Sequence, residues 1–159
     1  MKKQNYFLLL GLMLLAFGLN AQQSSTYCNN RFGFCVNYPA SLKQSADEPV
    51  NGDGISLEEK DGIKVSISGS FNVMNWTPER IYEFTVEDLS ADLGPKVKPI
   101  NSKVDENGFE ARFSNQTTYE YVRMWNQGDT YLVITVTGTQ SQLEKIEVLK
   151  DQMTASFGS

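Results

Sequence analysis

The sequence predicts an α+β fold: a largely antiparallel sheet of about six to seven strands with two helices, arranged as an α/β/α sandwich. Three observations predict it. Short strand-like runs are joined by tight turns, two stretches have helical periodicity, and two consecutive runs are apolar on both faces. Because strands that are apolar on both faces need a cover on each side, we expect the helices to pack on opposite faces of the sheet.

Three strands are expected before the first helix. Phe32–Tyr38 forms the opening strand, and the Asn51–Gly54 turn follows it. Ile55–Glu59 and Ile63–Ser68 then form a hairpin across Asp61-Gly62, and the second run alternates apolar and polar residues.

The first helix is predicted to begin at Thr77-Pro78-Glu79. Thr77 can cap the helix, Pro78 suits its first position, and an acidic residue suits its positive end. Gly94-Pro95 ends it. One apolar stripe with spacings of 4, 3 and 4 runs between these signals, at Tyr82, Val86, Leu89 and Leu93.

Four strands and a last helix complete the predicted order. The strands form hairpins at Asn107-Gly108 and Gln127-Gly128, and the second hairpin is apolar or aromatic on both faces. The expected ranges are Lys96–Glu106, Phe109–Asn115, Thr118–Asn126 and Thr130–Thr137 for the strands, and Gln140–Ser156 for the helix.

The N-terminus has the three parts of a secretory signal peptide. Lys2 and Lys3 precede an apolar run from Phe7 to Leu19, and small Ala21 stands before the expected cut. Thirteen helical residues span about 20 Å, too short for a membrane anchor that must cross about 30 Å. We therefore expect residues 1–21 to be a signal peptide and 22–159 a single domain, periplasmic or secreted, without a membrane span.

Composition excludes several classes of function. The chain has no histidine, so Ser-His-Asp triads, Cys-His dyads and histidine zinc sites are excluded. Loss of the two leader lysines takes the formal charge from −5 to −7. A negatively charged protein has no electrostatic attraction to nucleic acid or anionic lipid. We expect no bound cofactor or metal. The sequence leaves the oligomeric state open.

The two cysteines predict a structural disulfide. Cys28 and Cys35 flank six residues, and an oxidising compartment favours their pairing. Free thiols are the alternative. A catalytic dithiol is disfavoured, because such pairs typically have a CxxC spacing at a helix start.

The segment Arg31–Pro39, Arg-Phe-Gly-Phe-Cys-Val-Asn-Tyr-Pro, resembles the aromatic strand ending in Tyr-Pro that opens the PsbP-like fold. Small exported bacterial proteins of that fold look similar, and share turns like those at Asn51–Gly54 and Asp61-Gly62. The fold is that of photosystem II PsbP and a Ran-binding nuclear import factor. The resemblance implies a PsbP-like fold over residues 27–157 and an accessory, partner-binding role. It carries over no catalytic residue.

The best-defined candidate for partner binding is an aromatic face. Tyr121, Arg123 and Trp125 alternate onto one side of a predicted strand, with Tyr131 expected nearby on the next. Tyrosine, tryptophan and arginine dominate binding hot spots. The alternative is that a helix covers this face and Arg123 reaches the rim.

Acidic residues offer weaker candidates. Asn51-Gly52-Asp53-Gly54 is similar to the start of a calcium loop, but Pro49 and Lys60 stand where ligands are needed, which favours a plain turn. A carboxylate-based hydrolase would need two paired acids, and the spacing singles out no pair among Asp53, Glu58, Glu59, Asp61, Glu110 and Glu120.

We therefore expect a small exported, non-catalytic accessory or binding protein, whose partner is a protein or an envelope glycan. The alternatives are an extracytoplasmic glycan hydrolase that uses carboxylates, and a secreted inhibitor or envelope structural protein.

The leader generates a first prediction. Because the N-terminus has all three parts of a signal peptide, the protein isolated from its native host should begin at Gln22 or within two residues of it. N-terminal sequencing measures this directly, and an intact Met1 start in the fractionated envelope would contradict it.

Overall fold

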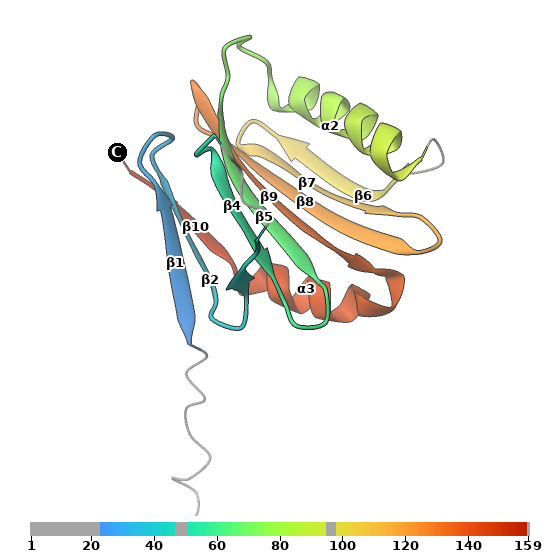
Figure 1. Ribbon diagram of the computed structural model, residues 1–159. Coiled ribbons are helices and arrows are strands. Elements are labelled where there is room, and N and C mark those ends of the chain that lie inside the picture. The colour runs from blue at the N-terminus through green and yellow to red at the C-terminus, as the bar shows by residue number, and fades with distance from the viewer. Residues whose placement is uncertain (1–22, 47–50, 95–97, 159) are drawn as a thin grey trace, which may run out of the picture.

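The computed structural model describes residues 23–46, 51–94 and 98–158, in two sheets and two helices that form three layers (Figure 1). The predicted signal peptide lies outside the described residues. Within these ranges no helix is both long enough and apolar enough to cross a membrane.

The middle layer is a seven-stranded antiparallel sheet, which confirms the predicted α+β fold class, although the predicted opening strand lies in a second, smaller sheet. Its strand order is β3-β4-β5-β9-β8-β7-β6. The bounds are β3 (Lys43–Gln44), β4 (Gly54–Glu58), β5 (Lys64–Phe71), β6 (Lys98–Asp105), β7 (Gly108–Ser114), β8 (Thr118–Asn126) and β9 (Thr130–Thr139).

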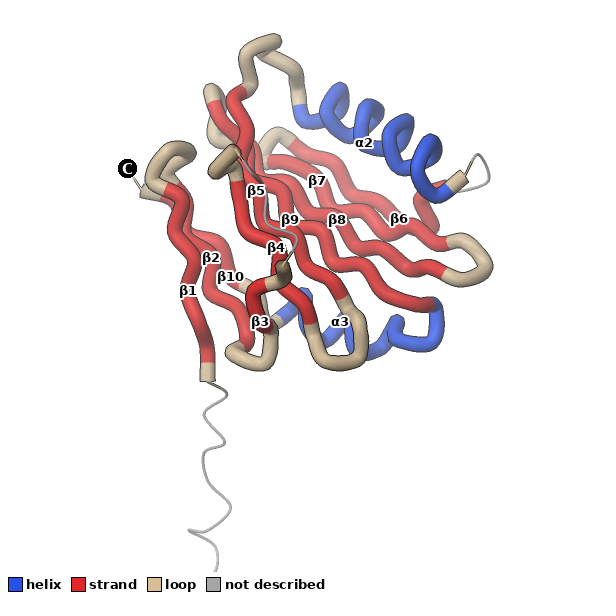
Figure 2. The backbone as a smooth tube through the Cα atoms, viewed as in Figure 1, coloured by secondary structure: helices blue, strands red, loops and turns tan. Residues whose placement is uncertain are grey.

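Helix α2 (Pro78–Leu93) covers one face of this sheet (Figure 2). As predicted, Thr77 caps it: the Thr77 hydroxyl accepts a hydrogen bond from the Arg80 backbone N–H. Four side chains of α2 pack on this face: Ile81, Tyr82, Val86 and Leu89. The sheet contributes the buried residues Phe109, Ala111, Phe113, Val122 and Met124.

The third layer combines helix α3 (Leu143–Asp151) with a three-stranded sheet in the order β1-β2-β10. A short 3₁₀ turn, Gln140–Gln142, precedes α3. The small sheet consists of β1 (Ser24–Asn29), β2 (Phe34–Pro39) and β10 (Thr154–Phe157). Val36 from β2, with Ile146 and Leu149 from α3, packs on the large sheet.

The small sheet is fitted closely to the large one at Gly69 of β5. A Cβ at position 69 would lie 2.5 Å from the ring of Phe32, a residue of the β1–β2 turn. Glycine is needed here because the Phe32 ring occupies the space that a side chain would take. Phe32 and Gly33 belong to the β1–β2 turn, which Gly33 N–H closes on Asn29 C=O, so strand β2 begins at Phe34, later than the predicted start at Phe32.

The predicted helix over Gln140–Ser156 is wrong beyond Asp151. Helix α3 ends at Asp151, and the chain continues as strand β10, which pairs antiparallel with β2. Met153 and Phe157 fit the helical spacing, but with Ala155 they also fit the alternation of a strand. Thr154 and Ser156 are weak helix formers, so the pairing with β2 decides the outcome.

The predicted disulfide is present and joins Cys28 of β1 to Cys35 of β2. These residues lie directly opposite each other, with Cα atoms 4.0 Å apart. Such short Cα distances are typical of non-hydrogen-bonded pairs, where the side chains are closest. The bridge therefore stabilises the hairpin to which β10 is added.

Helix α3 is attached to the large sheet by a partly buried ion pair. Arg112 of β7 donates from Nε and Nη2 to the two carboxylate oxygens of Glu147, at 2.9 and 3.0 Å. The Tyr119 hydroxyl donates to the same carboxylate at 2.7 Å. Burial raises the pKa of Glu147, but the hydrogen bonds from Arg112 and Tyr119 outweigh it, so the pKa lies below its usual 4.5.

Removal of the disulfide should destabilise the protein. In the chain-entropy model, a closed loop of about eight residues stabilises the fold by about 2.5 kcal/mol. We expect the double variant Cys28→Ser, Cys35→Ser to lose about this much free energy of unfolding in urea melts. Dithiothreitol should lower the midpoint of the wild type and leave the variant unchanged. Equal midpoints for oxidised wild type and variant would contradict the expectation.

The Glu147 carboxylate should contribute to stability only above acidic pH. Its folded pKa is lowered, so its contribution is complete at neutral pH, begins to fall as the pH approaches the usual value of 4.5, and is lost as the pH passes through the lowered folded pKa. Glu147→Gln should lower the free energy of unfolding by about 1–3 kcal/mol at pH 7 and by less at pH 3. Urea melts across pH 3–7 measure the difference. Glu87→Gln, a change of an exposed residue on α2, is the control. A loss of free energy of unfolding in Glu147→Gln that does not depend on pH would contradict the proposed role of the Glu147 carboxylate.

Candidate functional site

The third layer does not cover the whole large sheet, and a polar face remains open on β6, β7 and β8. Lys103, Glu110 and Arg123 lie side by side there, because Lys103 pairs with Glu110 and Glu110 pairs with Arg123 in register. Trp125 follows Arg123 on the same side of β8. We call Lys103, Glu110, Arg123 and Trp125 the open face.

A chain of alternating charges runs from the open face to helix α3. Arg123 Nη1 donates to Glu110 Oε2 at 2.8 Å, and the other oxygen of Glu110 lies 3.0 Å from Arg112 Nη2. Arg112 then binds Glu147, which is also 3.6 Å from Lys150 Nζ. Glu110 is thus held between two arginines, and its position is fixed from both sides.

Arg123 and Trp125 form a stacked pair. The guanidinium carbon lies 4.8 Å from the centre of the Trp125 ring, within the range of a cation–π interaction. The Arg123 side chain is 41% exposed. Its Nε is nevertheless shielded from water, and it has no hydrogen-bond partner in the part of the chain that the structure describes.

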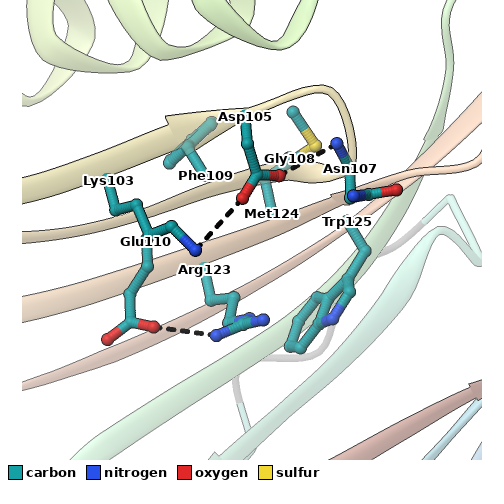
Figure 3. Close-up of a pocket in the computed structure, with 9 residues that line it drawn as sticks. All are labelled: Lys103, Asp105, Asn107, Gly108, Phe109, Glu110, Arg123, Met124 and Trp125. Atoms are coloured by element: carbon teal, nitrogen blue, oxygen red, sulfur yellow. Dashed lines mark hydrogen bonds and ion pairs between the residues drawn. The ribbon is translucent and has the colours of Figure 1, made fainter.

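Two pockets open on either side of Arg123. The hairpin pocket, about 230 Å³, lies at the β6–β7 turn (Figure 3). There Lys103 pairs with Asp105 at 3.3 Å, and Arg123 points toward Trp125. The β10 pocket, about 330 Å³, lies between β8 and the start of β10. Its lining residues outside the open face include Tyr121, Ile134, Lys150, Asp151, Met153, Thr154 and Ala155.

The structure divides the predicted aromatic face. Tyr121 is only 5% exposed and belongs to the core, where burial raises its pKa to about 12. Trp125 is half-buried against the same core. The Arg123 side chain is partly exposed. Thus α3 and β10 cover the Tyr121 end of the strand and leave the Trp125 end partly accessible.

The expected position of Tyr131 beside these residues is wrong. Tyr131 pairs with Asn126 in register, and it packs with Val133 on the α2 face of the sheet. Side chains alternate along a strand, so Tyr131 points away from Trp125. Lys103 and Lys150 were missed by the sequence analysis. The register of the Asn107-Gly108 hairpin, which places Lys103 opposite Glu110, would have identified Lys103.

The other acidic candidates serve structural contacts. Glu59 and Asp61 share Lys145 of α3 at 2.9 and 2.8 Å. The hydrogen bond from Ser41, and to a lesser extent the one from Lys145, lowers the pKa of Glu59. A general acid needs a raised pKa. Asp53, in the Asn51–Gly54 turn, forms an ion pair with Arg31 of the β1–β2 turn at 2.6 Å. This contact agrees with a plain turn at Asn51–Gly54.

Comparisons with known proteins identify the fold. No protein-family model and no curated protein matches the chain. Among solved structures, cyanobacterial PsbP (CyanoP) from Synechocystis sp. PCC 6803 has a TM-score of 0.60 at 12% identity, over 87% of this chain and 96% of that one. The Ran-binding protein Mog1p of Saccharomyces cerevisiae has a TM-score of 0.61 at 12% identity, over 84% and 96%. The chain therefore has the PsbP-like fold that its opening strand resembles.

Proposed function

We propose that this protein is an exported, non-catalytic binding module whose partner contacts the open face. The observation that carries the proposal is the incomplete cover of the large sheet: Arg123 and half-buried Trp125 lie between two pockets where the third layer ends. The disulfide is compatible with export, since such bonds persist in oxidising compartments.

The residue types on the open face suit binding better than catalysis. Arginine and tryptophan cover a large area at modest entropic cost and dominate binding hot spots. Glu110 is engaged by two arginines, so it serves to hold Arg123 in place. Mog1p is a Ran-binding protein, and the use of a PsbP-like fold for protein binding supports the same use here.

Site-specific photo-crosslinking in the native host tests the proposal. A photoreactive residue at position 103, on the open face, should form a defined adduct with an envelope component, because position 103 borders the hairpin pocket. The same residue at position 87, exposed on α2, is the matched control. The same adducts from both positions, or from position 87 alone, would overturn the proposal.

A core-versus-surface comparison completes this test. Tyr121→Ala should lower the free energy of unfolding by about 3–5 kcal/mol, as expected for a buried aromatic residue. Trp125→Ala should leave the protein folded and remove the position-103 adduct, since a hot-spot residue contributes about 2 kcal/mol or more to binding. A stability loss in Trp125→Ala as large as that in Tyr121→Ala would show that the Trp125 end also belongs to the core.

A further inference from the structure

The small sheet ends in an unpaired strand edge beside the open face. Strand β10 is the last strand in the order β1-β2-β10, and within the described ranges 23–46, 51–94 and 98–158 it pairs only with β2. Its residues Thr154 and Ala155 line the β10 pocket together with Arg123 and Trp125 of the large sheet. The free edge and the open face therefore border one space.

The hydrogen-bond pattern shows which backbone groups lie on this edge. Gly158 N–H donates to Gly33 C=O at 2.9 Å, so Gly158 faces β2. Alternate residues of an antiparallel strand face opposite edges, which places Thr154 and Ser156 toward β2 as well. The N–H and C=O groups of Ala155 and Phe157 consequently point away from β2, toward the free edge.

We propose that the partner binds as an extended peptide segment that adds a fourth strand beside β10. This inference rests on the proposed function, because it specifies how a partner occupies the same open face. Neighbouring strands lie about 4.8 Å apart, so the added strand would lie over Arg123 and Glu110, just beyond the present end of the third layer. Backbone pairing of this kind is a recurring mode of peptide recognition.

Arg123 indicates the side chain that such a peptide carries. Its guanidinium donates from Nη1 to Glu110, and its Nε is shielded from solvent and has no hydrogen-bond partner within residues 23–46, 51–94 and 98–158. A carboxylate of a peptide packed against Arg123 would accept from Nε and Nη2 together, in the side-on geometry that arginine favours. Lys150, in the same pocket, is already paired with Asp151 at 2.6 Å, so Arg123, which keeps an unpaired donor among the described residues, is the group that selects the side chain of the peptide. The peptide therefore carries an acidic residue at this position.

A displayed library of random nine-residue peptides supplies the probe. Selection on the oxidised wild-type protein should enrich peptides that carry an acidic residue, and their affinity is then measured by fluorescence anisotropy. Ala155→Pro should weaken binding at least tenfold, because it removes an outward N–H without removing a β2 pairing bond. Arg123→Gln should weaken the acidic peptides at least tenfold and their Asn/Gln versions little. Arg80→Gln on α2 removes the same charge elsewhere and is the control.

Amide hydrogen exchange shows where the peptide lies. Ala155 and Phe157 should exchange more slowly with the peptide bound, and a circular dichroism melt verifies that Ala155→Pro is folded. Slower exchange at β6 instead, or a library without saturable binders, would overturn strand addition at β10. The protein could instead form concentration-dependent dimers that Ala155→Pro abolishes. That result would assign the β10 edge to a second copy of the chain and would also overturn the proposal of peptide binding.

The two proposals can fail separately. If position 103 crosslinks to a partner whose binding is unchanged in Ala155→Pro and Arg123→Gln, the open face binds a partner by another mode and strand addition is wrong. If position 103 yields no specific adduct, the proposed function itself is wrong, whatever peptides bind in vitro.

Discussion

Strands β8 and β9 are apolar on both faces, and the layered structure depends on this constraint. Val122 and Met124 of β8, beside Phe113 of β7, need cover on one side, and α2 supplies it. Leu132, Ile134 and Val136 need cover on the other, where α3 and the small sheet lie. Exposed apolar strands would otherwise be sites of aggregation, so neither outer layer can be lost without exposing one of the two hydrophobic clusters.

The unequal extent of the outer layers explains where the charged residues lie. Beyond β10 the part of the chain that the structure describes gives the large sheet no apolar cover, and the side chains there change from Ile134 and Tyr121 to Arg123, Glu110 and Lys103. The Glu147–Arg112–Glu110–Arg123 chain connects covered and uncovered parts, so the position of α3 is coupled to that of Arg123. A partly buried network of this kind specifies geometry more than it adds stability.

The sequence predicted the parts of the structure that local patterns determine. The hairpin turns, the Thr77 cap and the bounds of β8 follow from turn chemistry, capping and alternation, and the Cys28–Cys35 bridge followed from compartment and spacing. Strands β1, β3 and β10 were not predicted, because short strands depend on partners far away in the chain, as Thr154 depends on Asn37. For the same reason the candidate site was found on β8 but misplaced at Tyr131, where the register across a turn decides the face.

The sheet edges differ in a way that bears on solubility. Strand β6 contains Pro99, an irregularity between Pro99 and Asn101, and Lys103, three features that hinder edge-to-edge pairing. Strand β10 has none of these in residues 154–157, but only Ala155 and Phe157 have backbone groups on its outer edge. Two residues offer too few main-chain hydrogen bonds to hold a neighbouring chain. The short edge therefore disfavours stacking into fibrils even though it carries no charged residue. A chain that does bind there must be selected by its side chains.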